Sequence, residues 1–482
     1  MGGVAVFCSF HSVMSRLRPM IVAHAFTILG LLTAIQVGAA VYSVGPGQPI
    51  AEVNDVPWEL LQPGDEVRIH WRPQPYRAKW VLCCRGTAEK RIHVKGVPGP
   101  QQQLPVIDGE NATTRKELNF WGESRAVIKI GGANRPADTL PGFITIEGLE
   151  IRNARMSNGF TGREGVTKYR KNAAGIYVEK GENIEIVGCN IHENGNGVMT
   201  GPNVRNLRVA GCFIHGNGAE KSIYEHNVYT ECQGLIFEFN RFGPLRRSCG
   251  GNNFKDRSSG MIFRYNWVEG GNRCLDLVDS KTPAITGDPA YRESLVYGNV
   301  LIKSAAAGNN QVVHYGGDSG STRHYRQGTL RFFQNTVVSF RRGNSVAFRL
   351  SSSNESVDCR NNIFYAGMPD GVMILLAERG RIDARDNWLN SDWRFTPGER
   401  SPIELAALNR SGRDPGFRNW MLRQFDLTAG SSALAAGQPI GNINSVSASA
   451  WAFQYHPHQS WTRRHETKKS RMDLGAFGGG QK

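Results

Sequence analysis

The stretch NNFKDRSSGMIFRYNW, residues 252–267, places two cations two residues apart in a segment that reads as a β-strand. Side chains alternate between the two faces of a strand, so Lys255 and Arg257 are expected on the same side of a sheet. Like charges on one face repel each other. We therefore expect a group from outside the chain to pair with both cations.

Similar short strands precede and follow this pair: AGIYVEK, GVMT, HNVYTEC, NFKDR, CLDLVD, VVHYGG, VAFRLSS and GVMILLAE. Alternation predicts that their apolar residues face inward. These inward residues are Ile176, Val178, Val198, Val228, Phe254, Leu275, Leu277, Phe348 and Leu350. The outward residues are Tyr177, Glu179, Met199, Asn227, Tyr229, Glu231, Lys255, Arg257, Asp276, His314 and Arg349. Together they predict a polar, mostly basic groove.

A basic groove of this kind suits β-elimination at a uronic acid. The enzyme must neutralise the carboxylate, stabilise a developing enolate, and supply a base and an acid. Lys255 is the candidate base, provided that neighbouring positive charge lowers its pKa. Arg257 is the group that holds the carboxylate, and Tyr229 or His314 is the acid or second base. The residues expected to contact the substrate are Asn227, Arg273, Asp276, Arg349, Tyr177 and His226.

Other interpretations of these residues remain open. Lys255 could be a solvated surface residue, Arg257 could pair only with Glu231 or Asp276, and His314 and His226 could be structural. Glycoside hydrolysis needs two carboxylates, for which the candidates are Asp276, Asp279, Glu231 and Asp318. A C5-epimerase shares the first proton abstraction with a lyase. A non-catalytic carbohydrate-binding surface protein is the remaining alternative.

The strands belong to an internal repeat. Segments such as FITIEGLEIRN, IEIVGCNIHENG and MIFRYNWVEGG recur with a base period in the low twenties and variable insertions. That pattern predicts an all-β parallel β-helix with about nine or more coils, each covering the hydrophobic face of the next. The column that aligns the repeats is Leu149, Cys189, Cys212, Asn240, Asn266, Asn299, Asn335, Asn362 and Asn387. Its asparagines predict a hydrogen-bonded ladder, and Cys189 and Cys212 could be bridged or free. Tyr229 precedes Asn240 by as many residues as Lys255 precedes Asn266, so we expect Tyr229 and Lys255 to be neighbours on adjacent coils, with Glu231 beside Arg257.

Segments near the two ends of the chain resemble those of a known superfamily. The LQPGDEVRIHW stretch near the start and DPGF, DLTAGSSALAAG and DLGAFGGG near the end resemble the opening and closing segments of the right-handed parallel β-helix superfamily. This implies N- and C-terminal caps over the exposed end coils. More narrowly, NNFKDR followed by RYN resembles the chondroitinase B and alginate lyase group of β-helix polysaccharide lyases. That resemblance implies a Lys base and calcium, for which Asn227 and Glu231 are the matching ligand positions.

The N-terminus predicts export. Arg16 and Arg18 precede an apolar run that ends in small residues, which is typical of a cleaved signal peptide. The net charge of +15 falls to +13 without these two residues, and an exported basic protein favours an acidic polysaccharide over nucleic acid or membrane. We expect a secreted or periplasmic monomer.

The repeat and the signal predict four segments. They are a signal peptide at 1–40, an N-terminal cap with the first coils at 41–142, the β-helix core with the site at 143–395, and a C-terminal coil and cap at 396–482. Three basic insertions, 155–172, 280–291 and 317–328, are candidate walls of the groove or solvated loops.

Overall fold

The computed structural model describes residues 38–482 apart from 378, 398–402, 444–445, 469 and 480–482, so most of the predicted signal peptide lies outside the described residues. From Ala39 onward the chain forms one compact unit. Within this described part, no helix combines the length and the hydropathy needed to cross a membrane.

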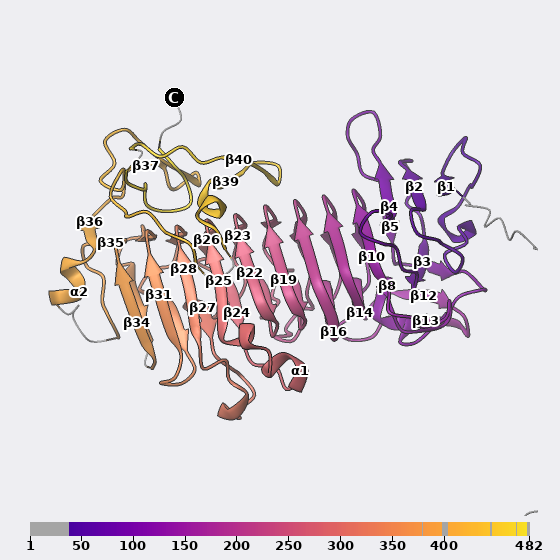
Figure 1. Ribbon diagram of the computed structural model, residues 1–482, viewed down its shortest axis with the longest axis horizontal. Helices are drawn as coiled ribbons and strands as arrows, with labels where there is room; N and C mark the ends of the chain where they lie inside the picture. Colours follow the sequence, from indigo (N-terminus) through magenta and orange to yellow (C-terminus); the bar gives the residue numbers. More distant parts are fainter. Residues whose placement is uncertain (1–37, 378, 398–402, 444–445, 469, 480–482) are drawn as a thin grey trace, which may run out of the picture. The chain divides into compact units, whose positions relative to one another are not determined.

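Each coil contributes strands to three parallel sheets, and Figure 1 shows successive coils side by side. Sheet 1 contains β3 (Ala78–Leu82), β8 (Ala126–Ile130), the first parts of β14 (Ala174–Val187) and β16 (Asn196–Ala210), β18 (Val228–Thr230), β21 (Phe254–Asp256), β24 (Leu275–Leu277), β27 (Gln311–Tyr315), β30 (Asn344–Leu350) and β33 (Val372–Leu376). Sheet 2 contains β1 (Val41–Val44), β2 (Glu66–His70), β4 (Ile92–Val97), β10 (Gly142–Glu147), the second parts of β14 and β16, β19 (Gln233–Glu238), β22 (Ser259–Arg264), β25 (Glu293–Tyr297), β28 (Thr329–Phe333), β31 (Ser356–Arg360) and β34 (Arg381–Arg385).

Sheet 3 has eleven strands in the described part of the chain, which confirms a β-helix of nine or more coils. They are β5 (Val106–Asp108), β11 (Glu150–Arg152), β15 (Asn190–His192), β17 (Phe213–His215), β20 (Arg241–Phe242), β23 (Trp267–Glu269), β26 (Val300–Lys303), β29 (Thr336–Ser339), β32 (Ile363–Ala366), β35 (Trp388–Asn390) and β36 (Arg410–Gly412).

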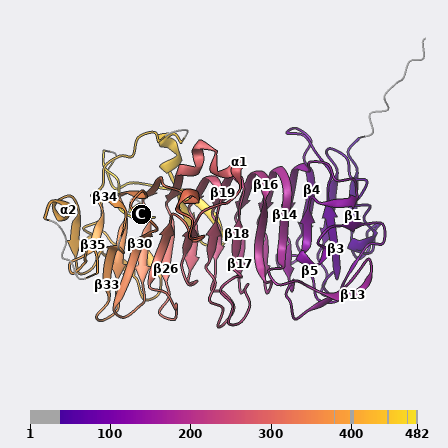
Figure 2. The ribbon, with the colours of Figure 1, turned by 90° about the horizontal axis from the view of Figure 1, so that it is seen from below.

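The remaining elements are short strands and helices that lie between or after the strands of the three sheets. They are β6 (Ala112–Thr114), the antiparallel pairs β7 (Asn119–Phe120)–β9 (Ala133–Arg135), β12 (Gly159–Gly162)–β13 (Gly165–Lys168), β37 (Phe417–Asn419)–β38 (Gln424–Leu427) and β39 (Phe453–His456)–β40 (Ser460–Arg463), and the helices α1 (Pro283–Thr286) and α2 (Ile403–Ala407). Short 3-10 turns lie at Val53–Asp55, Glu123–Arg125, Pro289–Arg292, Thr322–His324 and Ala448–Trp451. Figure 2 shows α1 from below, after a 90° turn from the view of Figure 1. The Ala284 carbonyl of α1 accepts from Gln233 Nε2 at the start of β19.

The predicted asparagine ladder is present at the turn from sheet 2 to sheet 3. Asn266 Nδ2 donates to Asn299 Oδ1 at 3.1 Å, and Asn266 Oδ1 accepts from the Asn240 amide at 3.0 Å. The same pattern runs on to Asn409, one coil beyond the prediction. Because every buried turn amide gains a partner, the ladder stabilises the stack of coils.

The cysteines of the column take the acceptor position of the ladder. Cys212 Sγ accepts from the Cys189 amide at 3.4 Å, and the Cys212 amide donates to Asn240 Oδ1. All eight cysteines of the described residues are free thiols. Of the two possibilities left open by the sequence, the structure contains packed thiols.

The inward residues predicted from alternation are all buried in one continuous core. The C-terminal segment folds back along the later coils (Figure 1). In this segment the indole of Trp451 packs edge-on against Tyr297, with ring centroids 4.5 Å apart. Near the end coil, the Leu405 carbonyl of α2 accepts from Asn409 Nδ2 at 2.7 Å, and Leu405 packs against the core. These elements cover apolar surface and strand edges that would otherwise be exposed.

Candidate functional site

Five of the predicted residues lie in one column on the outer face of sheet 1. The strand register pairs Tyr229 with Lys255, Lys255 with Asp276, Asp276 with His314, and His314 with Arg349. Neighbouring strands in a sheet are about 4.8 Å apart, so these side chains are direct neighbours. The predicted adjacency of Tyr229 and Lys255 is confirmed, and the column extends across five coils.

Lys255 lies between two carboxylates. Its Nζ donates to Asp276 Oδ2 at 2.9 Å and to Asp318 Oδ2 at 2.5 Å, and the side chain is only 12% exposed. Burial alone would lower the pKa of Lys255, but the charges of Asp276 and Asp318 raise it above its ordinary value. The role of base expected from the sequence required neighbouring positive charge to lower this pKa, and the structure places negative charge there instead. Lys255 is therefore held protonated in this arrangement.

Asp276 is the central acceptor of the column. Its Oδ2 accepts from Asn252 Nδ2 at 2.7 Å as well as from Lys255, and its Oδ1 accepts from His314 Nδ1 at 2.8 Å and Arg273 NH1 at 3.3 Å. Burial alone would raise the pKa of Asp276, but the His314 hydrogen bond and the surrounding cations hold it well below its usual range. Asp276 is thus a fixed anion that positions Lys255, and Arg273 reaches the site through it.

His314 is neutral and structural in character. Arg349 NH1 lies 2.9 Å from His314 Nε2, and because a guanidinium can only donate, Nε2 accepts and the ring proton is on Nδ1. Burial, followed by the charges of Arg273 and Arg349, lowers the pKa of His314 despite the opposing effect of Asp276.

Ser351 completes what looks like a Ser–His–Asp arrangement. Its Oγ lies 2.8 Å from His314 Nε2, but it also accepts from the Gly317 amide and lies 2.9 Å from the Gly317 carbonyl. Because Arg349 already uses the Nε2 lone pair, His314 is not free to take the Ser351 proton. Ser351 instead fixes Gly317. The sequence analysis did not single out Ser351, although it directly follows an inward residue of β30.

Arg257 lies two residues after Lys255, directly beyond the end of β21, and also binds Asp318. Its Nε donates to Tyr229 OH at 3.0 Å, its NH2 donates to both oxygens of Asp318 at 2.9 and 3.2 Å, and its NH1 donates to the Asp279 carbonyl. The sequence placed Glu231 beside Arg257, but Glu231 Oε1 accepts from the hydroxyls of Ser280 and Thr282. The acids that pair with Arg257 are Asp318, at 2.9 Å, and the buried Asp279, at 3.7 Å.

The predictions that Asn227 faces outward and contacts the substrate are wrong, because Asn227 is fully buried. It belongs to a second asparagine ladder, in which its Oδ1 accepts from Asn217 and its Nδ2 donates to Asn253. The alternation rule fails here because Asn227 lies in the turn before β18, where the two-residue period does not apply.

The calcium expected from the family resemblance does not fit these residues. Asn227 has its amide oxygen occupied inside the core, and Glu231 is bonded to hydroxyl donors. In the part of the chain that the structure describes, no group of three or more His, Cys, Asp or Glu side chains is arranged to hold a metal ion. Asn227 and Glu231 therefore do not form a calcium site.

His226 and Tyr177 lie at the margins of the site. His226 is 2% exposed, and its Nδ1 accepts from the Asn252 amide at 2.9 Å, which agrees with the structural interpretation and contradicts direct substrate contact. Tyr177 occupies the same column two coils before Tyr229, where it is mostly buried and lies under the guanidinium of Arg125. Tyr177 therefore lies at the edge of the groove and not beside Lys255.

His226 predicts a specific acid sensitivity. Burial, followed by the charge of Lys255, lowers its pKa from 6.5 to about 3. The unfolded chain therefore binds this proton first, and the stability is lost as the pH falls from 6.5 towards 3, by up to about 1.4 kcal/mol per pH unit. We expect His226→Asn, which retains an acceptor for Asn252, to flatten the urea-unfolding free energy between pH 6.5 and 4. His456→Asn, on an exposed hairpin, is the control, and equal slopes in wild type and His226→Asn would contradict the prediction.

The three predicted loops have different roles. The first contains the hairpin β12–β13, which pairs with β6 near the start of the β-helix. The second contains α1 and supplies the hydroxyls that bind Glu231. The third, 317–328, supplies Asp318 to the site, and its Arg326 is buried rather than part of a basic wall.

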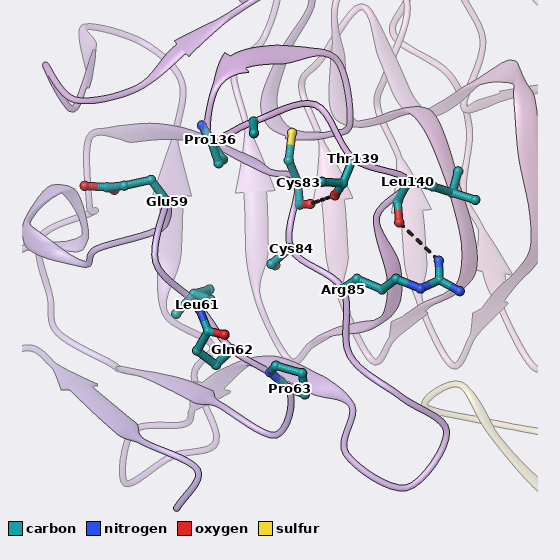
Figure 3. Close-up of a pocket in the computed structure, with 11 residues that line it drawn as sticks. Glu59, Leu61, Gln62, Pro63, Cys83, Cys84, Arg85, Pro136, Thr139 and Leu140 are labelled. Carbon is teal, nitrogen blue, oxygen red and sulfur yellow. Dashed lines mark hydrogen bonds between the residues drawn. The ribbon is translucent and has the colours of Figure 1, made fainter. Parts of the chain in front are cut away.

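A cavity of about 510 Å³ lies elsewhere, among the first coils (Figure 3). Thr139 Oγ1 donates to the Cys83 carbonyl and Arg85 NH1 donates to the Leu140 carbonyl at its wall. Burial raises the pKa of Cys83 and of Cys84 to about 12, so neither is a thiolate nucleophile at neutral pH. The converging charged groups are in the sheet 1 column and not in this cavity.

Comparisons with known proteins concern the fold. A family model described as "Right handed beta helix region" matches residues 106–290, and no curated protein sequence gives a significant match. Three solved structures with a similar fold are an alginate lyase from Paenibacillus sp. str. FPU-7 (11% identity, 68% of this chain and 95% of that chain, TM-score 0.46), a rhamnogalacturonan lyase (13%, 72% and 87%, 0.47) and a lacto-N-biosidase from Eubacterium ramulus (12%, 77% and 68%, 0.41).

At these identities and TM-scores, the similarity carries no argument about chemistry. The fold rests on the matched region and on the coil-by-coil strand pairing of the three sheets. Together they show that the chain folds as a right-handed parallel β-helix, with the family match confined to residues 106–290.

Proposed function

We propose that the protein is an exported polysaccharide lyase that cleaves a uronate-containing polysaccharide by β-elimination on the outer face of sheet 1. One observation carries the proposal. Lys255 Nζ and Arg257 NH2 converge on a single carboxylate, that of Asp318, with Tyr229 OH 3.0 Å from Arg257 Nε. A uronate carboxylate needs the same two donors when its C5 proton is removed.

The proton transfers follow from the charges around each group. Protonated Lys255 is suited to give a proton to the glycosidic oxygen at C4. Tyr229, whose oxygen accepts from Arg257 Nε, takes the proton from C5 once its hydroxyl has released its own proton. The C4–O bond breaks as the C4–C5 double bond forms. Transfer of the gained proton from Tyr229 to Lys255, its neighbour in the column, restores both groups.

Glycoside hydrolysis is the less favoured alternative. Of the acids near Lys255, Asp276 already accepts from four donors and is buried, so it has no free lone pair directed at a substrate. Asp279 is fully buried, with its Oδ1 accepting from two loop amides. Asp318 is partly exposed beside Lys255, whereas Glu231, which is also partly exposed, is bonded to the hydroxyls of Ser280 and Thr282. Hydrolysis needs two carboxylates that act on the same bond.

The test is the ultraviolet absorbance of the mature protein incubated with alginate, pectate, glucuronan and glycosaminoglycans. A lyase produces a conjugated double bond, so we expect absorbance to rise with one of these polymers. Reducing ends without absorbance would replace the proposal with hydrolysis. Retention in an affinity gel without either signal would make the column a binding site.

A further inference from the structure

The loop that carries Asp318 is held on both sides of Asp318, and the Asp318 amide itself donates to Asp279 Oδ1 at 2.7 Å. On one side, Ser351 Oγ accepts from the Gly317 amide at 2.9 Å. On the other, Arg326 NH1 donates to the Ser258 carbonyl at 2.8 Å from a fully buried position. Gly316 and Gly320 flank Asp318 and have φ values of +130° and +79°, which residues other than glycine rarely adopt.

Asp318 differs from the other acids of the site in exposure. Its side chain is 32% exposed, whereas those of Asp276 and Asp279 are 2% and 0% exposed. Burial alone would raise the pKa of Asp318, but Lys255 and Arg257 lower it, so it is an anion at neutral pH. Asp318 is the most exposed member of these ion pairs, so water can solvate its carboxylate when it leaves Lys255 and Arg257.

Departure of Asp318 would leave two donors directed at one point. Lys255 would keep Asp276, and Arg257 would keep Tyr229 OH and the Asp279 carbonyl, so neither side chain would lose its position. The N–H groups now used by Asp318 would be free, and they have the spacing of a carboxylate because they bind one here.

We propose that Asp318 occupies the subsite for a substrate carboxylate and must be displaced by the uronate. This inference rests on the proposed function in assigning the carboxylate to a uronate. A tethered carboxylate has an effective concentration in the millimolar range, so a free monosaccharide competes poorly. A polymer gains further contacts along the column, where Arg273 and Arg349 are partly exposed, and so displaces Asp318.

The experiment is calorimetric titration of wild type and Asp318→Asn with oligogalacturonate, oligomannuronate and the corresponding monomers. Asparagine keeps the shape of the side chain and removes its charge. We expect Asp318→Asn to bind one oligouronate at least about tenfold more tightly than wild type and to bind its monomer measurably. Asp383→Asn, an exposed acid paired with Arg385 on sheet 2, is the matched control and should change affinity less than twofold.

The possible results of this titration distinguish the carboxylate subsite from the lyase activity. Equal or weaker binding by Asp318→Asn would overturn the inference, since Asp318 would then only hold the cations in place. Tighter binding without any elimination product would support the carboxylate subsite and reject the lyase. Tighter binding by Asp383→Asn as well would show that removing any surface negative charge raises the affinity, and it would also overturn the inference.

Discussion

Replacing Lys255 with arginine is expected to lower the rate of elimination by about 10²–10⁴-fold while leaving oligouronate affinity within about threefold. Arginine keeps the positive charge next to Asp276 but is not deprotonated in proteins, so it cannot donate or accept the proton that the reaction transfers. The measurement is kcat from ultraviolet absorbance together with Kd from calorimetry on the same oligomer.

Two further variants separate proton transfer from charge and from folding. Lys255→Met should lose both turnover and affinity, because Asp276 and Asp318 then face each other with one cation fewer. Lys95→Arg, on the exposed face of sheet 2 beside Glu147, should behave as wild type. If Lys255→Arg retained more than a tenth of the wild-type rate, Lys255 would be a counter-charge and the proton donor would have to be sought elsewhere.

The column of the site could be predicted from the sequence because two regularities fix it. Strand alternation assigns each residue to a face, and the asparagine ladder fixes the register between coils. Tyr229 and Lys255 each precede their ladder residue by the same distance, which predicted the observed pairing. The apolar core followed for the same reason, since Val228 and Phe254 occupy the alternate positions.

What lay outside the strands could not be predicted in this way. Asp318 comes from a loop whose path depends on contacts with Ser351 and Arg326, and no period in the sequence encodes those contacts. The electrostatic environment of Lys255 was therefore misjudged, because its second anion comes from that loop. Asn227 was misplaced for a related reason, since a turn residue follows neither face of a strand.

Replacing Arg326 with methionine is expected to lower the free energy of unfolding by about 3–5 kcal/mol, because it leaves the fully buried carboxylate of Asp256 without its cation. Arg326 NH2 donates to Asp256 Oδ2 at 3.0 Å, and the guanidinium lies near the rings of Tyr291 and Tyr315. Arg326 also holds the 317–328 loop against the coil, so the same variant should expose that loop to proteases. Urea unfolding and limited proteolysis measure the two effects.

A double variant distinguishes the buried charge from lost packing. Asp256→Asn combined with Arg326→Met removes both charges, so it should be less destabilised than Arg326→Met alone. Arg385→Met breaks an exposed pair with Asp383 and should cost at most about 1 kcal/mol. Should Arg326→Met unfold at the same urea concentration as Arg385→Met, the Asp256–Arg326 pair would not anchor the loop, and the position of Asp318 would have to depend on Ser351 and Asp279 instead.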